Sequence, residues 1–270
     1  MDASTDSTRD AFVDVPGGRV FVRAWERASR ESPLILLHDS LGCVDLWREF
    51  PGALSRRLRR TVFAYDRLGF GRSSERHDVP SADFVREEAT TQFPALRRAL
   101  GIDRCVLFGH SVGGSMAFHI ASTWPDACDA VISEATQPVM EERTFEGIRD
   151  ACRVFARPEQ FEKLRRLHGS RAEWVLRAWA ERWLSPEFAR WSLEAVLAAV
   201  RCPILAIHGD RDEFGSIAFP RAIERWSSGP CTVAILEPCG HVPHRERAND
   251  VLTLVARFLE GTSAAAPAVE

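Results

Sequence analysis

One short segment carries a residue type and spacing suited to covalent chemistry. In CVLFGHSVGGSM, residues 105–116, Ser111 stands between Gly109 and Gly113 in the pattern G-x-S-x-G. An apolar run before the serine predicts a buried strand, and apolar residues at helical spacing after it predict a helix that ends before Trp124–Pro125. A strand that becomes a helix within one residue strains that residue and projects its side chain. The segment therefore predicts a serine nucleophile at the carboxyl end of a sheet.

Backbone donors are expected on either side of this serine. The first N–H groups of a helix have no partner within the helix, so they can hold the oxyanion of an acyl-transfer reaction. We expect the N–H of Val112 to be one such donor. The second is expected from the loop HDSLG, His38–Gly42, which follows an earlier strand, and the N–H of Ser40 is our choice.

A serine hydroxyl needs a carboxylate-oriented histidine to take its proton. The segment HGDRDEF, residues 208–214, follows a late strand and offers two carboxylates. Asp212 is favoured, because Gly209 lets the chain turn and two further residues reach over the sheet edge. Asp210, immediately past that glycine, is in a position to organise the turn. Glu134, at the end of the preceding strand, is a third candidate.

The base is expected in EPCGHVPH, residues 237–244, after the last strand. His241 follows a glycine in a loop, and a loop can bring an imidazole towards a neighbouring strand end. His244 begins the last helix and is interpreted as structural. The sequence thus predicts the catalytic set Ser111, Asp212 and His241. His77 and His168 are expected to be exposed.

The elements that must position these residues alternate along the chain. A hairpin is predicted at Ala11–Val15 and Arg19–Trp25. Further strands are predicted at Pro33–His38, Thr61–Tyr65, Val106–Phe108, Ala130–Ser133, Pro203–His208 and Thr232–Leu236. Helices are predicted at Trp47–Arg60, Ser81–Leu100 (bent at Pro94), Ile217–Trp226 and Arg247–Leu259. This order predicts an α/β fold with an eight-stranded, mostly parallel sheet flanked by helices. Ligands of such sheets bind at the carboxyl ends of the strands.

The stretch 136–200 has no strand pattern and predicts an all-helical insertion after the sixth strand. Its expected helices are Thr144–Phe155, Pro158–His168, Ser170–Leu184 and Pro186–Val200. The remaining core then comprises residues 11–135 and 201–260. Residues 1–10 and the tail GTSAAAPAVE are expected to be loose.

Composition limits the function classes. The chain has 270 residues, 45% of them hydrophobic, and a formal net charge of −3, so no global field attracts nucleic acid or an anionic membrane. Seven scattered cysteines without a C-x-x-C pair predict neither a disulfide framework nor a zinc site. The start MDASTDSTRD has no apolar signal region and no apolar run reaches membrane-spanning length. We expect a cytoplasmic protein without a metal site.

Taken together, the motifs resemble the α/β-hydrolase superfamily over nearly all of residues 11–260. The matching motifs are G-H-S-V-G-G, D-R-L-G-F-G-R-S at 66–73, H-G-D-R-D and G-H-V-P-H, with the order Ser, Asp, His. Relatives usually read His-Gly in the oxyanion loop, where this chain reads His38–Asp39. The resemblance implies cofactor-free acyl transfer through an acyl-enzyme on Ser111, with the helical insertion as a cap.

Several activities share this catalytic set. The favoured function is hydrolysis of small to medium carboxylic esters. Thioesterases, lactonases and metal-free haloperoxidases use the same catalytic set and are alternatives. A further alternative is a non-catalytic receptor of this fold. Carbon–carbon bond hydrolases of ring-cleavage products are the nearest alternative. They commonly show Asn before the serine and Trp after the histidine, where this chain has His110 and Val242. The expected partner is a small acyl substrate, with oligomeric state undetermined.

Overall fold

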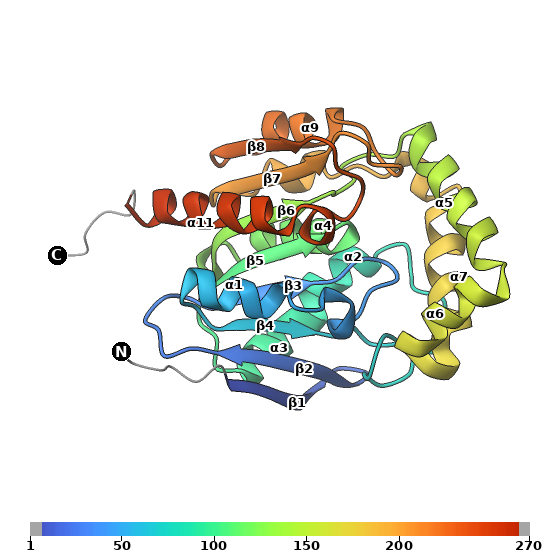
Figure 1. Cartoon of the computed structure of the whole chain (residues 1–270), viewed down its shortest axis with the longest axis horizontal. Coiled ribbons are helices and arrows are strands. Elements are labelled where there is room, and N and C mark those ends of the chain that lie inside the picture. The colour runs from blue at the N-terminus through green and yellow to red at the C-terminus, as the bar shows by residue number, and fades with distance from the viewer. Residues whose placement is uncertain (1–6, 265–270) are drawn as a thin grey trace.

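An eight-stranded sheet forms the centre of the protein, which we describe from a computed structural model over residues 7–264 (Figure 1). The strand order is β1-β2-β4-β3-β5-β6-β7-β8. Strand β2 is antiparallel to both of its neighbours, and the other neighbouring strands are parallel. The strands are β1 Ser7–Val15, β2 Gly18–Glu26, β3 Leu34–Leu37, β4 Val62–Tyr65, β5 Cys105–His110, β6 Cys128–Glu134, β7 Ile204–Gly209 and β8 Cys231–Leu236. The predicted fold class is confirmed.

Helices cover both faces of the sheet (Figure 1). The core helices are α1 Phe50–Leu58, α2 Phe84–Glu87, α3 Phe93–Ala99, α4 Val112–Thr123, α9 Ala218–Trp226, α10 Pro243–Glu246 and α11 Ala248–Ala264. Short 3₁₀ turns lie at Val44–Trp47 and Pro125–Ala127. One hydrophobic cluster joins α3 and α4 to the sheet, and a second joins α1 and α11 to its other face. Burial on both faces explains the uninterrupted apolar runs of β3 and β5.

Two predicted helices of the core have different boundaries. The helix expected at 47–60 begins at Phe50, after a 3₁₀ turn. The helix expected at 81–100 is divided into α2 and α3 by a π-helical turn, Glu88–Gln92, directly before Pro94. Because proline has no N–H to donate to the preceding turn, the ladder widens there.

Between β6 and β7 the chain is helical, as predicted. This helical insertion contains α5 Glu142–Phe155, α6 Pro158–His168, α7 Ala172–Trp183 and α8 Glu194–Leu197, with 3₁₀ turns at Gly169–Arg171 and Phe188–Arg190. The continuous helix predicted at 186–200 is wrong. Ser192 instead forms a β-bridge with Val139, and the N–H of Leu193 donates to Pro138 O. These contacts with the chain before α5 override the local helical pattern.

The ends of the described chain also differ from expectation. Residues 7–10, predicted to be loose, pair with β2, and Asp10 accepts hydrogen bonds from the Arg23 guanidinium. Helix α11 continues through 261–264, which were also predicted to be loose. The rest of both predicted loose segments, 1–6 and 265–270, lies outside the described residues.

Within residues 7–264, none of the helices combines the length and the apolar character that crossing a membrane requires.

Candidate active site

Ser111 occupies a strained turn between β5 and α4. Its φ is 55° and its ψ is −122°, a conformation that residues with a Cβ rarely adopt. A Cβ on Gly109 would lie 2.2 Å from Gly113 O, and one on Gly113 would lie 2.1 Å from Leu37 O. Close contact between strand and helix therefore requires both glycines of the motif. The turn is fixed by a 2.8 Å hydrogen bond from Ser111 N–H to Glu134 O.

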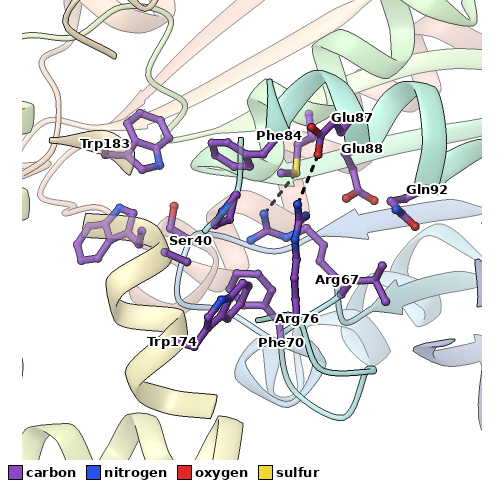
Figure 2. Close-up of a pocket in the computed structure, with 15 residues that line it drawn as sticks. Ser40, Arg67, Phe70, Arg76, Phe84, Glu87, Glu88, Gln92, Trp174 and Trp183 are labelled. Atoms are coloured by element: carbon purple, nitrogen blue, oxygen red, sulfur yellow. Dashed lines mark hydrogen bonds and ion pairs between the residues drawn. The ribbon is translucent and has the colours of Figure 1, made fainter. Parts of the chain in front are cut away.

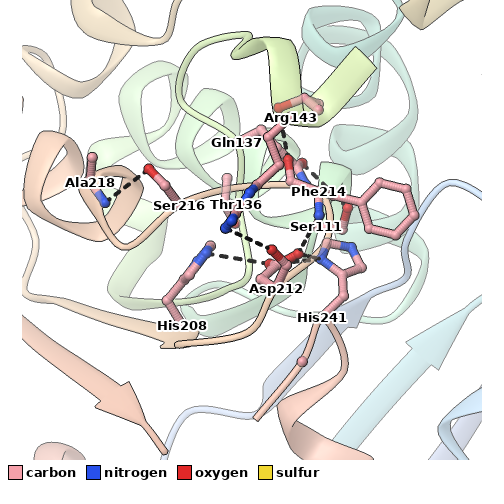
Figure 3. A network of polar contacts seen from close by, with 12 residues as sticks. Ser111, Thr136, Gln137, Arg143, His208, Asp212, Phe214, Ser216, Ala218 and His241 are labelled. Carbon is pink, nitrogen blue, oxygen red and sulfur yellow. Dashed lines mark hydrogen bonds and ion pairs between the residues drawn. The ribbon is translucent and has the colours of Figure 1, made fainter. Parts of the chain in front are cut away.

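Loops after β7 and β8 bring Asp212 and His241 together (Figure 3). His241 Nδ1 lies 2.9 Å from each carboxylate oxygen of Asp212. Asp212 Oδ1 also accepts the N–H of Phe214 at 2.8 Å, and His208 Nε2 lies 3.4 Å from Oδ2. Both Asp212 and His241 are buried. The carboxylate thus orients the imidazole with its Nδ1 turned inward.

The contact between Asp212 and His241 shifts the pKa of both groups. Burial alone would lower the pKa of His241, but the Asp212 carboxylate outweighs burial and raises that pKa above its ordinary value. Burial would likewise raise the pKa of Asp212, and His241 outweighs it and lowers that pKa. An imidazolium at residue 241 is therefore stabilised, as a general base requires once it has taken a proton.

Ser111 and His241 line the same cavity, which we call the triad cavity. Its volume is about 170 Å³. The Ser111 hydroxyl donates to Gln137 Oε1 at 3.4 Å in this conformation (Figure 3). Apolar side chains from the helical insertion and the β7 loop form much of its wall: Ile148, Ala151, Phe155, Trp179, Trp183 and Phe214. A molecule in this cavity would contact both the hydroxyl and the imidazole.

The other two candidate carboxylates have different partners. Asp210 Oδ1 accepts the N–H of Cys239 at 2.9 Å, which fixes the turn after β7. Glu134 Oε2 lies 2.6 Å from His244 Nδ1, and both residues are buried. Of the three candidates, Asp212 is the one placed against His241.

The loop expected to supply the second oxyanion donor lies beside the start of α4. A Cβ on Gly113 would meet His38 O at 2.9 Å, and Ser40 lines the triad cavity. Val112 is the first residue of α4. The backbone groups predicted as donors therefore come from two adjacent segments at the same edge of the sheet.

Sequence reasoning missed several residues around the site. Gln137 follows β6 by three residues, and its position after a strand end was the available signal. His110, which the sequence places beside the nucleophile as a support for the loop, donates from Nε2 to His241 O at 2.8 Å. His168, expected to be exposed, is buried: its Nδ1 accepts the Gly71 N–H at 3.0 Å and its Nε2 donates to Leu41 O at 2.9 Å. It thereby joins the helical insertion to two core loops.

One buried group has the composition of a metal site. Ligand atoms of His110, Glu134 and His244 lie within 4.8 Å of one another. Hydrogen bonds already use His244 Nδ1 with Glu134 and His110 Nε2 with the backbone of His241. We therefore interpret the group as a hydrogen-bonded support for the loop that carries His241.

Comparison with known proteins identifies the fold family. Residues 32–248 match the model of a family described as alpha/beta hydrolase fold. The chain is 36% identical over 104 residues to human (Homo sapiens) 1-acylglycerol-3-phosphate O-acyltransferase ABHD5. The matched residues make up 38% of this chain and 29% of that protein. It is 36% identical over 95 residues to human (lyso)-N-acylphosphatidylethanolamine lipase, 35% of this chain and 27% of that protein. These matches span less than a third of either relative.

Among solved structures, the chain is similar to a bacterial membrane phospholipase A, with a TM-score of 0.80 and 24% identity. That match covers 96% of this chain and 87% of the other. At this identity the likeness concerns the fold alone.

Proposed function

The chain belongs to the alpha/beta hydrolase fold family, and we propose that it is a serine hydrolase of small to medium carboxylic esters. The observation that carries the proposal is the placement of a strained Ser111 and a buried Asp212–His241 pair around one cavity. Fold alone would not support it, because many functions share this fold.

Ser111 is proposed as the nucleophile and His241 as the general base. The Ser111 hydroxyl turns from Gln137 towards His241 and transfers its proton to the imidazole as Oγ attacks the ester carbonyl. Asp212 stabilises the imidazolium that forms. His241 then protonates the leaving alcohol. Water, activated by the same imidazole, hydrolyses the acyl-enzyme and restores the Ser111 hydroxyl.

Backbone N–H groups of Ser40 and Val112 are proposed to bind the oxyanion. Support comes from the position of Val112 at the start of α4 and of Ser40 in the cavity wall. Donors fixed by a strand–helix turn need no reorganisation when charge develops on the carbonyl oxygen.

Residues 136–200 are proposed to form a cap on a core of 11–135 and 201–260. The apolar wall contributed by Ile148, Ala151, Phe155, Trp179 and Trp183 supports this division, because it closes one side of the triad cavity. An apolar wall favours a hydrocarbon acyl chain over a polar one. The cap then selects the acyl group, and the core supplies the chemistry.

Labelling with a fluorophosphonate probe tests the assignment. We expect one covalent adduct at Ser111, located by peptide mass spectrometry, and none in Ser111→Ala. Ser115→Ala is the matched control, because Ser115 is a fully buried serine of the same helix and its variant should still be labelled. Folded wild-type protein that resists the probe would contradict the proposal and favour a non-catalytic receptor.

A substrate panel tests the ester class. p-Nitrophenyl esters of increasing acyl length are expected to be hydrolysed, alongside slower or absent turnover of acyl-thioesters and ring-cleavage dienoates. Turnover of the dienoates alone would replace ester hydrolysis by carbon–carbon bond hydrolysis.

A further inference from the structure

A second cavity, which we call the arginine cavity, is drawn in Figure 2. The two share the lining residues Ser40, Trp179 and Trp183, so they meet at the proposed oxyanion loop. Their characters differ. The triad cavity is largely apolar, whereas the second is lined by two arginines, Arg67 and Arg76, and by two glutamates, Glu87 and Glu88. Its volume is about 50 Å³, which suits a small polar group.

Arg67 is buried in this cavity without a carboxylate partner. Its side chain is 6% exposed. It donates to His38 Nε2 at 3.2 Å, to Asp39 O at 2.6 Å and, from Nη1, to Met116 Sδ at 3.6 Å. These acceptors are neutral, and a thioether sulfur is a weak one. Within residues 7–264 no carboxylate lies within ion-pair distance of this guanidinium, an unusual state for a buried charge.

The other charged groups that line the cavity, Arg76, Glu87 and Glu88, have polar partners of their own. Arg76 also points into the cavity (Figure 2), but it is hydrogen-bonded to the exposed Asp78 and lies 3.8 Å from Glu87. Glu88 accepts the Tyr65 hydroxyl at 2.6 Å and attracts Arg67 only from beyond ion-pair distance. Of the two arginines that line the cavity, Arg67 is the one without an ion-pair partner among residues 7–264, and its Nη1 donates only to a thioether sulfur.

We propose that the arginine cavity binds a carboxylate carried by the substrate, with Arg67 Nη1 as the main donor and Arg76 as a second positive charge. The inference rests on the proposed function, because it places the ester at Ser111 and the anion beyond Ser40. One molecule can then span both cavities, with its hydrocarbon part against the insertion and its carboxylate on Arg67. The preferred substrates become esters that carry a free carboxylate.

Binding to the inactive variant Ser111→Ala tests this without turnover. Two matched pairs are titrated by calorimetry: monobutyl succinate against butyl succinamate, and the butyrate esters of 4-hydroxybutanoate and 4-hydroxybutanamide. The pairs put the anion on the acyl side or on the alcohol side. We expect the carboxylate of at least one pair to bind at least about 10-fold more tightly than its neutral carboxamide.

Variants identify the donor. Arg67→Met in the same background should abolish the preference, Arg67→Lys should restore part of it, and Arg76→Met should weaken it. Arg177→Met is the matched control, since Arg177 is a half-exposed arginine of α7 paired with Glu181 and its loss should leave the preference intact. If Arg67→Met does not fold, the weaker carboxylate preference of Arg76→Met is the result that tests the cavity.

Equal affinity within both pairs, or a preference that survives Arg67→Met, would overturn the inference. Because the Ser111→Ala protein needs only to bind, this outcome is separate from a failure of the hydrolase proposal, which is read from probe labelling of the wild type.

Discussion

Two buried carboxylate–imidazole pairs lie at the carboxyl edge of the sheet, and they face different surroundings. Asp212 holds His241, which lines the triad cavity. Glu134 holds His244, which packs against the ring of Trp47 at a centroid distance of 4.6 Å. Because His241 lines the triad cavity together with Ser111 and His244 does not, we assign chemistry to the first pair and support of the loop to the second.

Substitution of the two acids should separate these roles. Asp212→Asn is expected to lower kcat roughly 10³- to 10⁴-fold, because the amide cannot hold the productive tautomer or stabilise the imidazolium. Glu134→Gln should change kcat only a few-fold, since it keeps a hydrogen-bonding group beside His244. Steady-state kinetics on the best p-nitrophenyl ester measure both, and the opposite ranking would move the acid to the end of β6.

The same contact predicts a pH dependence. His241 must be neutral to accept a proton, and Asp212 raises its pKa, so activity should fall as pH drops through a value above the usual 6.5. In Asp212→Asn the carboxylate is lost and burial remains, so the acidic limb of kcat/KM should move to lower pH. An acidic limb at the same pH in both proteins would contradict the role of Asp212.

At the residue scale, the sequence predicted the groups that follow a motif and missed those that depend on packing. Asp212 and His241 were found because each follows a glycine in the loop after a strand. Arg67 was visible in the D-R-L-G-F-G-R-S motif, but its isolation from carboxylates is a property of the folded chain. His168 was misplaced because its two hydrogen bonds cross to residues about 100 and 127 positions away.

At the element scale, the close contact between β5 and α4 leaves no space for a side chain at Gly109. Gly109→Ala would place a Cβ 2.2 Å from a backbone oxygen that belongs to the helix and cannot move alone. We expect a loss of about 3 kcal/mol or more in the free energy of unfolding, measured by urea denaturation.

Gly261→Ala is the control for that substitution. Gly261 lies in α11 with nothing within 4 Å of an added Cβ, so alanine there should raise stability by up to about 1 kcal/mol. Equal effects at the two glycines would show that the close strand–helix contact is not what requires glycine in the motif.

Strands were predicted more accurately than helices, for a physical reason. Buried parallel strands are continuous apolar runs bounded by polar turns, and β3, β4 and β7 begin and end within one residue of prediction. Helix boundaries in 186–200 and 81–100 depended on a β-bridge at Ser192 and on a missing donor at Pro94. Neither feature changes the spacing of apolar residues from which the helices were predicted.

At the scale of the whole molecule, histidines are mostly held neutral inside the fold. Burial lowers the pKa of five of them below the ordinary value, to about 4 for His110 and His119. The five are His38, His110, His119, His168 and His208. An unfolded chain would protonate the same groups near pH 6.5. Unfolding in mild acid must therefore take up protons.

This difference predicts that stability falls steeply as pH is lowered from about 6.5 towards 4. Each histidine that is neutral in the native state and protonated in the unfolded state contributes a slope of up to about 1.4 kcal/mol per pH unit, with stability lost on the acid side. His241 acts in the opposite sense, because its raised pKa favours the native state below that pKa, but it is one group against five.

Urea denaturation at several pH values gives the slope of stability against pH, and with it the number of protons taken up on unfolding. His119→Gln, on α4, should reduce the uptake by about one proton. A free energy of unfolding that stays constant between pH 7 and 5 would mean that these imidazoles titrate in the folded chain as they do in water.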